Sequence, residues 1–202
     1  MNYLKDVISL KNRYFAMRHG HSESNALDIF VTDPDNGVDG YGLTELGRKQ
    51  AEKSAKKNSQ SNILDKETII YTSDFKRARE TAEIARIILK AAPVNLEKKL
   101  RERYFGIFEM DSLSNYTKVW EEDKANPNSK KYEVESANEL LKRMTSIIPD
   151  LENKHSGKKI LLVSHADPLQ LLNVGFLKVS ASEHCKLKFF ENAEIRELKL
   201  KK

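Results

Sequence analysis

The sequence has a single cysteine and a single tryptophan, and it contains no long apolar run. Because Cys185 stands alone, the 202-residue chain cannot form an internal disulfide, which fits a reducing compartment. No apolar stretch approaches the roughly 20 residues needed to cross a bilayer. Residues 1–6 do not open a secretory signal. We therefore expect a cytoplasmic protein that is not embedded in a membrane.

Clusters of metal ligands and nucleic-acid-binding patterns are also missing. The histidines and the cysteine show no ligand spacing, and His155 and His184 stand in polar stretches typical of a surface. The net charge is +5, but the lysines are scattered and are not interleaved with aromatic residues. We expect no metal, no cofactor and no nucleic-acid partner. The basic surplus is compatible with a small anionic substrate.

What is present is an alternation of apolar runs and amphipathic stretches in a chain that is 39% hydrophobic and 32% charged. The patterns predict strands over residues 13–17, 68–72, 94–100, 159–163, 185–190 and 194–200. They predict helices from Thr44 to about 58, after Ser73-Asp74, after the capping box of Ser136 and Glu139, and after Asp167-Pro168. Residues 28–42 are expected to form a loop and 111–130 a polar excursion with some helix.

This alternation is typical of an α/β protein whose mostly parallel sheet is covered by helices on both faces. We expect one domain over residues 1–202, built as a three-layer sandwich with a core of about 13–200. A surface insertion is expected at about 111–132. No repeat, low-complexity segment or linker divides the chain.

Three of the expected strands end in polar residues that do not suit a core. The first ends in Arg18-His19, the second in Ser73-Asp74 with Arg77 one turn later, and the late one in Ser164-His165. Ligands of open α/β sheets bind beyond the carboxyl ends of the strands. If these strands are neighbours, two histidines and two arginines meet at one place.

The chemistry of these residues suits a phosphate. Arginine presents fork-shaped donors that match phosphate oxygens, and a neutral imidazole is a competent nucleophile toward phosphorus. Glu102, which follows another expected strand, is a candidate proton donor. Each residue alone is more often structural, as a hydrogen-bonding histidine or a surface ion pair. The interpretation rests on their coincidence at three strand ends.

Five motifs in order along the chain give a family resemblance. Residues 18–25 resemble the R-H-G-x-S-x-x-N signature of the histidine phosphatase superfamily, whose fold is also called phosphoglycerate mutase-like. Residues 43–51 resemble its L-T-x-x-G-x-x-Q-A helix, residues 73–82 its S-x-x-x-R-A-x-x-T-A segment, residues 100–106 its L-x-E-x-x-x-G segment, and Ser164-His165 its S-H-G motif. The resemblance covers about residues 13–200.

The resemblance implies a role for each matching residue. His19 would attack phosphorus and become phosphohistidine. Glu102 would protonate the leaving oxygen and then accept a proton from water, while the catalytic His165 would hold a phosphoryl oxygen and stabilise its charge in the transition state. The remaining groups would bind the phosphoryl oxygens: the side chains of Arg18, Arg77 and Asn25, and the backbone amides near Gly20 and Ala166. The family needs no metal for this reaction.

Two positions depart from the family pattern. Ala166 replaces the usual glycine, which keeps the backbone N–H available. Asp167 would repel a phosphate unless it caps the following helix, and we favour the cap. His21 occupies a variable position and is expected to face solvent.

Three functions compete. We expect a metal-independent phosphomonoesterase that acts on a small phosphorylated metabolite. The alternatives are a cofactor-dependent phosphoglycerate mutase using the same site, or a non-catalytic module that binds a phospho-ligand. Mutases of the family typically carry Trp-Asn in the first motif, whereas this chain has Ser24-Asn25. Retention of all the chemical groups argues against the binding module.

Overall fold

A five-stranded sheet forms the centre of the molecule in a computed structural model that describes residues 1–202. Its strands are β1 (Arg13–Arg18), β2 (Ile69–Thr72), β3 (Asn95–Leu96), β4 (Lys159–Ser164) and β5 (Ile195–Leu198), in the order β3-β2-β4-β1-β5. Every pair is parallel except β1 with β5, which is antiparallel. The mostly parallel sheet is therefore confirmed.

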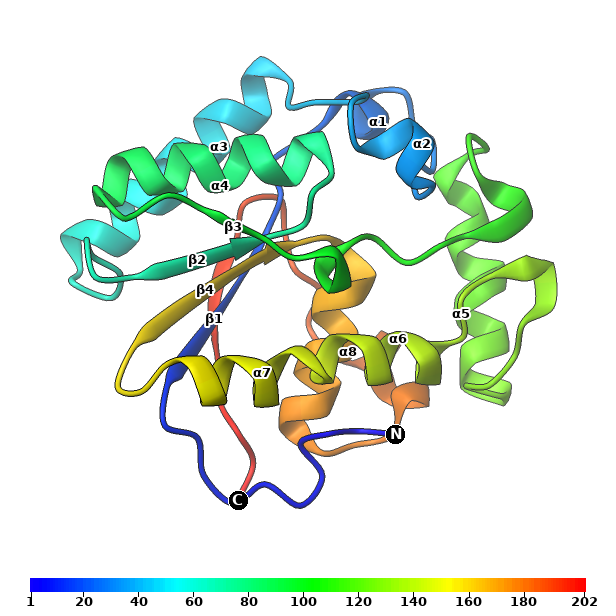
Figure 1. Ribbon diagram of the computed structural model, residues 1–202. Coiled ribbons are helices and arrows are strands. Elements are labelled where there is room, and N and C mark those ends of the chain that lie inside the picture. The colour runs from blue at the N-terminus through cyan, green and yellow to red at the C-terminus, as the bar shows by residue number, and fades with distance from the viewer.

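Helices cover both faces of the sheet, as expected (Figure 1). The helices are α1 (Glu23–Ala26), α2 (Pro34–Gly37), α3 (Glu45–Gln60), α4 (Lys76–Leu89), α5 (Tyr116–Ala125), α6 (Ala137–Thr145), α7 (Ile147–Lys154) and α8 (Ala166–Leu177). Short 3-10 turns are η1 (Lys98–Leu100), η2 (Gly106–Phe108), η3 (Leu113–Asn115), η4 (Lys131–Glu133) and η5 (Ala181–Lys186). None of the helices has the length and apolarity that a membrane span requires.

The alternation of side chains along β1 divides the core into two layers. Phe15 and Met17 pack with α3 and α4, whose buried positions are mostly alanines. Tyr14 and Ala16 point to the opposite face and pack with α6, α7 and α8. Successive side chains of a strand face opposite sides, so one apolar strand supplies both layers. The three-layer sandwich follows from this arrangement.

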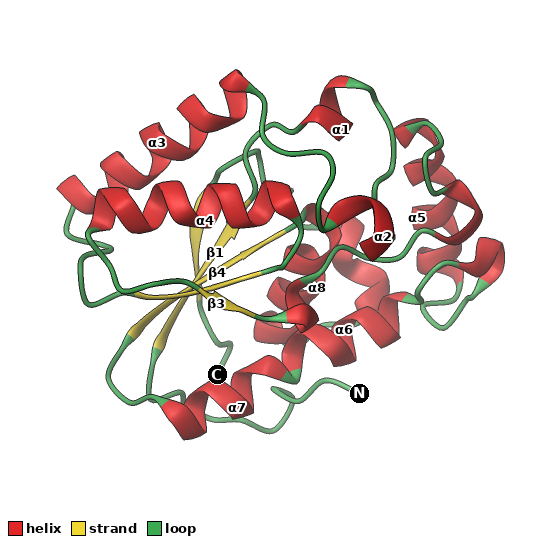
Figure 2. Cartoon of the chain, turned by 45° about the horizontal axis from the view of Figure 1, so that its top comes forward, coloured by secondary structure: helices red, strands yellow, loops and turns green.

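A third apolar cluster lies beyond the carboxyl ends of the strands. Phe30, Phe105, Phe108, Val119 and Val134 are buried together, away from the two layers around the sheet. Figure 2 shows α5 at this end of the molecule, beyond α2 and α8. The segment expected to be a polar excursion thus carries a ten-residue helix with its own buried contacts.

Two expected strands are shorter or absent. Only Asn95–Leu96 pairs with β2, because Glu97 then accepts a hydrogen bond from the Lys99 amide and caps a 3-10 turn. The strand predicted at 185–190 does not form. The carbonyl groups of Lys188 and Phe189 instead accept hydrogen bonds from the Arg196 guanidinium. These carbonyl groups therefore have hydrogen-bond partners without a neighbouring strand.

Candidate active site

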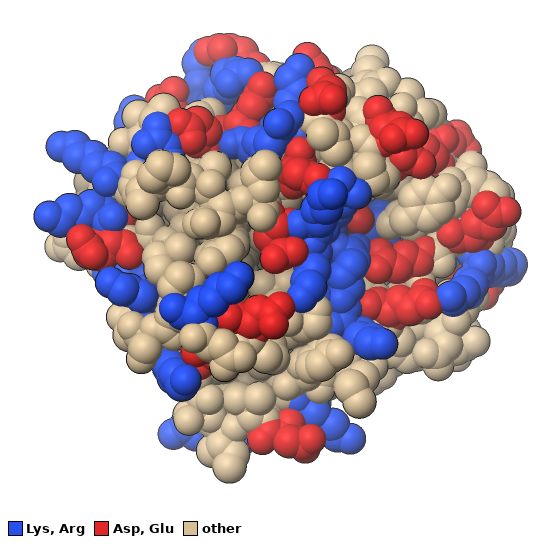
Figure 3. Space-filling model, viewed as in Figure 1, with Lys and Arg blue, Asp and Glu red and all other residues tan.

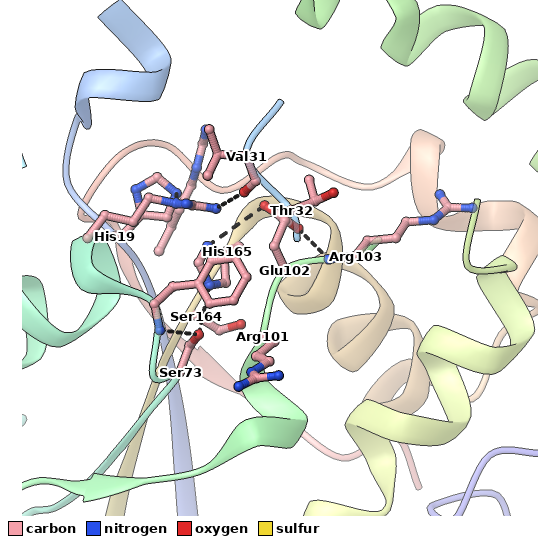
Figure 4. Close-up of polar contacts among 12 residues, drawn as sticks. His19, Val31, Thr32, Ser73, Arg101, Glu102, Arg103, Ser164 and His165 are labelled. Atoms are coloured by element: carbon pink, nitrogen blue, oxygen red, sulfur yellow. Dashed lines mark hydrogen bonds and ion pairs between the residues drawn. The ribbon is translucent and has the colours of Figure 1, made fainter. Parts of the chain in front are cut away.

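The polar residues at three strand ends converge because β1, β4 and β2 are neighbours in the sheet. Arg18, the last residue of β1, is in register with Ser164 at the end of β4. His19 and His165 follow these strands, and their ring centres lie 5.2 Å apart. Arg77 enters from the first turn of α4, after β2. Figure 4 shows His165 between Ser73 on one side and Glu102 on the other, with His19 nearby.

His19 is buried and held in one tautomer. Its Nδ1 lies 2.7 Å from the carbonyl oxygen of Gly20, which can only accept, so Nδ1 carries the proton. Nε2 therefore presents its lone pair, toward which Arg77 Nε donates over 3.3 Å. Burial, reinforced by the positive charges of Arg77 and Arg18, lowers the pKa of His19 well below its usual value. The imidazole is neutral and nucleophilic at Nε2.

The two arginines keep unused donors in this buried place. Arg77 donates from Nη2 to the Val31 carbonyl, while its Nη1 is buried without a partner. Arg18 donates from Nη1 to the Phe190 carbonyl, and its Nε has no partner either. A buried donor without an acceptor costs about 1–3 kcal/mol. An anion bound between them would supply the missing acceptors and two compensating charges.

His165 is fully buried beside His19, and it does not itself line the cavity. Its Nε2 is 3.0 Å from the hydroxyl of Ser73, and its Nδ1 is 3.8 Å from Glu102 Oε2 without a hydrogen bond. Burial and the charge of Arg77 lower the pKa of His165 well below its usual value. Its Nδ1 is thus a further buried polar atom without a partner, and it faces the carboxyl group of Glu102.

Glu102 supplies the carboxyl group. Its pKa is raised to about 7, chiefly by burial, which the positive charge of Arg77 partly opposes and the negative charge of Asp167 reinforces. The amide of Arg103 donates to Glu102 Oε1 over 2.8 Å, which leaves Oε2 facing His165. A carboxyl group with a pKa near neutrality can exchange a proton in either direction.

The smaller expected contributors lie at the rim of the site. Asn25 uses its Oδ1 to accept from the amide and hydroxyl of Ser22, which caps α1. The Gly20 amide donates to Thr81 Oγ1, so its expected contact with phosphate requires that bond to break. Ala166 is the first residue of α8, where amides lack helical partners.

His21, expected in solvent, is half-buried beside the hydroxyl of Thr44.

Asp167 does not cap α8, contrary to our interpretation. His165 stands at the N-cap, and Asp167 is fully buried with its Oδ2 3.2 Å from Arg103 Nη1. Arg103 also makes two hydrogen bonds to Asp123, which receives a third from His184. The positive charge of Arg103 thus offsets Asp167 beside the expected phosphate site.

His184 was expected at the surface, and it is completely buried instead. Burial alone would lower the pKa of His184, but its hydrogen bond to Asp123 outweighs this effect and raises the pKa to about 9. The polar sequence around it did not reveal the carboxylate 61 residues away.

A cavity of about 40 Å³ opens onto the converging side chains. Its wall includes Arg18, His19, Asn25, Arg77 and Glu102, all singled out from the sequence. Reasoning from the sequence missed much of the remaining lining, which comes from residues 29–32 together with Leu113 and Tyr116. The spacing of Tyr116 and Trp120 on one helix face was the available signal. No group of three or more His, Cys, Asp or Glu side chains is arranged to hold a metal ion.

The fold and the site together define an α/β protein that places a neutral histidine, two arginines and a carboxyl group around one anion-sized cavity. The sequence profile of the histidine phosphatase superfamily (branch 1) matches residues 14–202. The chain belongs to this superfamily.

Relatives in sequence carry the names of mutases. The chain is 33% identical over 163 residues to a probable phosphoglycerate mutase GpmB of Photorhabdus laumondii, covering 78% of this chain and 71% of that protein. It is 28% identical to phosphoglycerate mutase-like protein 4 of Arabidopsis thaliana, covering 77% of this chain and 67% of that protein.

Solved structures with the same fold carry the names of phosphatases. A mycobacterial glucosyl-3-phosphoglycerate phosphatase with VO3 superposes with a TM-score of 0.76 at 20% identity, covering 92% of this chain and 90% of that one. A phosphoserine phosphatase mutant of Entamoeba histolytica with phosphoserine superposes with a TM-score of 0.73 at 23% identity, covering 92% and 89%. At these identities the likeness establishes the fold, and it confirms the phosphoglycerate mutase-like architecture.

Proposed function

We propose that the protein is a metal-independent phosphomonoesterase that acts on a small phosphorylated metabolite through a phosphohistidine intermediate. The observation that carries the proposal is the pairing of a neutral, buried His19 with a carboxyl group, Glu102, whose pKa is about 7. One group is a nucleophile at neutral pH and the other is a proton donor at the same pH.

In the first half-reaction, His19 Nε2 forms a bond to phosphorus as the bond from phosphorus to the ester oxygen breaks. Glu102 donates its proton to that oxygen, and the alcohol leaves. Arg18, Arg77 and His165 hold the phosphoryl oxygens, whose charge is spread in the transition state. The buried donors of the two arginines support this role.

In the second half-reaction, water attacks the phosphorus of phosphohistidine. Glu102, now a carboxylate, takes the proton from water, the bond from Nε2 to phosphorus breaks, and inorganic phosphate leaves. The Nδ1–H bond to the Gly20 carbonyl keeps Nε2 as the reacting nitrogen throughout. One carboxyl group serves both steps because the acid of the first is the base of the second.

A phosphoglycerate mutase is the second candidate, and two observations favour it. The relative with 33% identity is named a probable mutase. The cavity is also small and enclosed by residues 29–32 and by Leu113 and Tyr116, and a mutase must keep water from its phosphohistidine. Against it, the first motif has Ser24-Asn25 where mutases of the family typically carry Trp-Asn.

The deciding assay compares release of inorganic phosphate with interconversion of 2- and 3-phosphoglycerate, each without added metal and with or without the bisphosphate primer. The phosphatase assay should include 3-phosphoglycerate, phosphoserine, sugar phosphates and nucleotides. We expect phosphate release from at least one ester that does not depend on primer. Fast primer-dependent interconversion with negligible phosphate release would replace this proposal with the mutase.

A further inference from the structure

Tyr116 is the one side chain of α5 that lines the cavity with His19, Arg77 and Glu102. It is the first residue of the helix, in the segment that follows the motif around Glu102. Its ring lies 4.7 Å from that of Phe30, 5.0 Å from that of Phe105 and 5.2 Å from that of Trp120, measured between centres. Three aromatic neighbours therefore fix the direction of the ring.

The hydroxyl of Tyr116 is free within this packed environment. No protein group forms a hydrogen bond with it, although the side chain is largely enclosed. Aromatic rings pack against the body of the side chain, and Tyr116 lines the cavity, so its hydroxyl is available to a bound ligand. Burial and the negative charge of Glu102 raise the pKa of Tyr116 well above its usual value, which keeps the hydroxyl protonated as a donor.

The helix that carries Tyr116 is anchored beside Glu102. Arg103, whose amide donates to Glu102, holds Asp123 on α5 through two hydrogen bonds of 2.7 and 2.8 Å. On the other side, the segment before α5 is tied to residues 28–30 by backbone hydrogen bonds. Phe105, three residues after Glu102, packs edge-on against Tyr116. These contacts hold Tyr116 in a fixed position relative to Glu102, with which it lines the same cavity.

We propose that Tyr116 is a further catalytic residue, whose hydroxyl donates a hydrogen bond to the leaving oxygen beside Glu102. This inference rests on the proposed phosphatase function. In-line transfer places the leaving oxygen on the side of phosphorus opposite His19, where Glu102 must also lie. Glu102 transfers its proton to that oxygen, while the tyrosine stabilises the developing negative charge and keeps its own proton. In the second half-reaction the hydroxyl holds the attacking water in the same position.

The test compares Tyr116→Phe with Tyr132→Phe, a tyrosine of the same region that packs on Phe108 and does not line the cavity. Initial rates are measured with p-nitrophenyl phosphate, whose leaving group needs little stabilisation, and with phenyl phosphate, which needs more. We expect Tyr116→Phe to lower kcat/KM about tenfold or more for phenyl phosphate and much less for p-nitrophenyl phosphate. Tyr132→Phe should match the wild type with both.

Unchanged rates in Tyr116→Phe, or an equal loss with both esters, would overturn the assignment because neither reflects a bond to the leaving oxygen. Calorimetric titration with orthovanadate gives a readout that does not need turnover, since vanadate places an oxygen where the leaving group would be. The vanadate Kd should rise about tenfold in Tyr116→Phe and stay constant in Tyr132→Phe. A wild type that binds vanadate but hydrolyses no ester contradicts the phosphatase proposal, whereas an unchanged vanadate Kd in Tyr116→Phe contradicts the role of Tyr116.

Discussion

At the scale of single residues, the site depends on removing two histidines from water. His19 and His165 are both buried beside cations, and each has a lowered pKa for that reason. The sequence alone placed them at strand ends, and the ordered motifs assigned their roles. The sequence could not reveal that the Gly20 carbonyl selects the tautomer of His19, because this contact depends on the local backbone geometry.

Replacing His19 should remove the covalent intermediate. We expect His19→Ala to lose essentially all turnover, since the other imidazole of the site, His165, is assigned to holding a phosphoryl oxygen and not to attack on phosphorus. Wild-type protein quenched with alkali should carry acid-labile, base-stable phosphate, and His19→Ala should carry none. His21→Ala is the matched control, because His21 lies two residues away beside Thr44 and does not line the cavity. Normal turnover by a folded His19→Ala protein would contradict the mechanism.

The carboxyl group of Glu102 should set a pH limit. The first half-reaction needs Glu102 protonated, and its pKa is about 7, so kcat/KM for an alkyl phosphate should fall as the pH rises above 7. The side chain in Glu102→Gln cannot donate a proton. This variant should therefore be slow with alkyl phosphates, and its kcat/KM should not fall as the pH rises above 7. The loss should be smaller with p-nitrophenyl phosphate, which leaves without protonation. We would measure kcat/KM of the wild type and of Glu102→Gln from pH 5 to about 9. The comparison distinguishes titration of Glu102 from titration of the substrate's own phosphate group.

At the scale of secondary-structure elements, the strand ends were predictable and the connections were not. An apolar run that ends in charged residues marks a buried strand and its exit, which is why β1, β2 and β4 were located closely. The run Lys186-Leu187-Lys188-Phe189-Phe190 alternates like a strand, yet its carbonyls are bound by Arg196 and Arg18. Arg18 is distant in the sequence and Arg196 lies on another element, β5. The alternation of residues 186–190 alone could therefore not show that these arginines would bind the carbonyl groups in place of a neighbouring strand.

Helix α4 offers a direct test of how one element contributes to the site. Arg77 and Arg79 lie two residues apart on this helix, so they face different directions. Arg77 is buried in the cavity, whereas Arg79 is partly exposed and contacts the Val38 carbonyl. We expect Arg77→Ala to lower kcat/KM about a hundredfold or more, and Arg79→Ala to leave it nearly unchanged. Equal effects would mean that α4 acts through general stability, which thermal unfolding of both variants would reveal.

At the scale of the whole molecule, the sequence predicted the layers because apolar strands alternate with amphipathic helices along the chain. It did not predict the third apolar cluster beyond the sheet. That cluster joins residues 30, 105, 108, 119 and 134, which lie on loops and on α5 and show no common period. Only tertiary contact between the loop after β1 and the segment after η1 brings them together.

The buried ion network should make global stability depend on pH. The folded-state pKa of His184 is about 9, against an unperturbed value of about 6.5, so its contribution is complete below pH 6.5 and disappears as the pH rises through 9. His184→Gln should lower the free energy of unfolding by up to about 3 kcal/mol at pH 6, and its difference from wild type should shrink toward pH 10. Urea unfolding at several pH values measures this, with the half-buried His155→Gln as control. A pH-independent difference would show that His184 stabilises by packing alone.

The solitary Trp120 packs between Tyr116 and Phe189, and it faces the buried ring of His184. Because the chain has no second indole, all emission excited at the red edge of the absorption band comes from α5. Protonated imidazole is an efficient quencher of indole, so separation of this helix from its neighbours would brighten the signal. The protein thus carries its own optical probe one turn from Tyr116, and rapid-mixing experiments can test without a label whether α5 moves when a ligand enters or leaves.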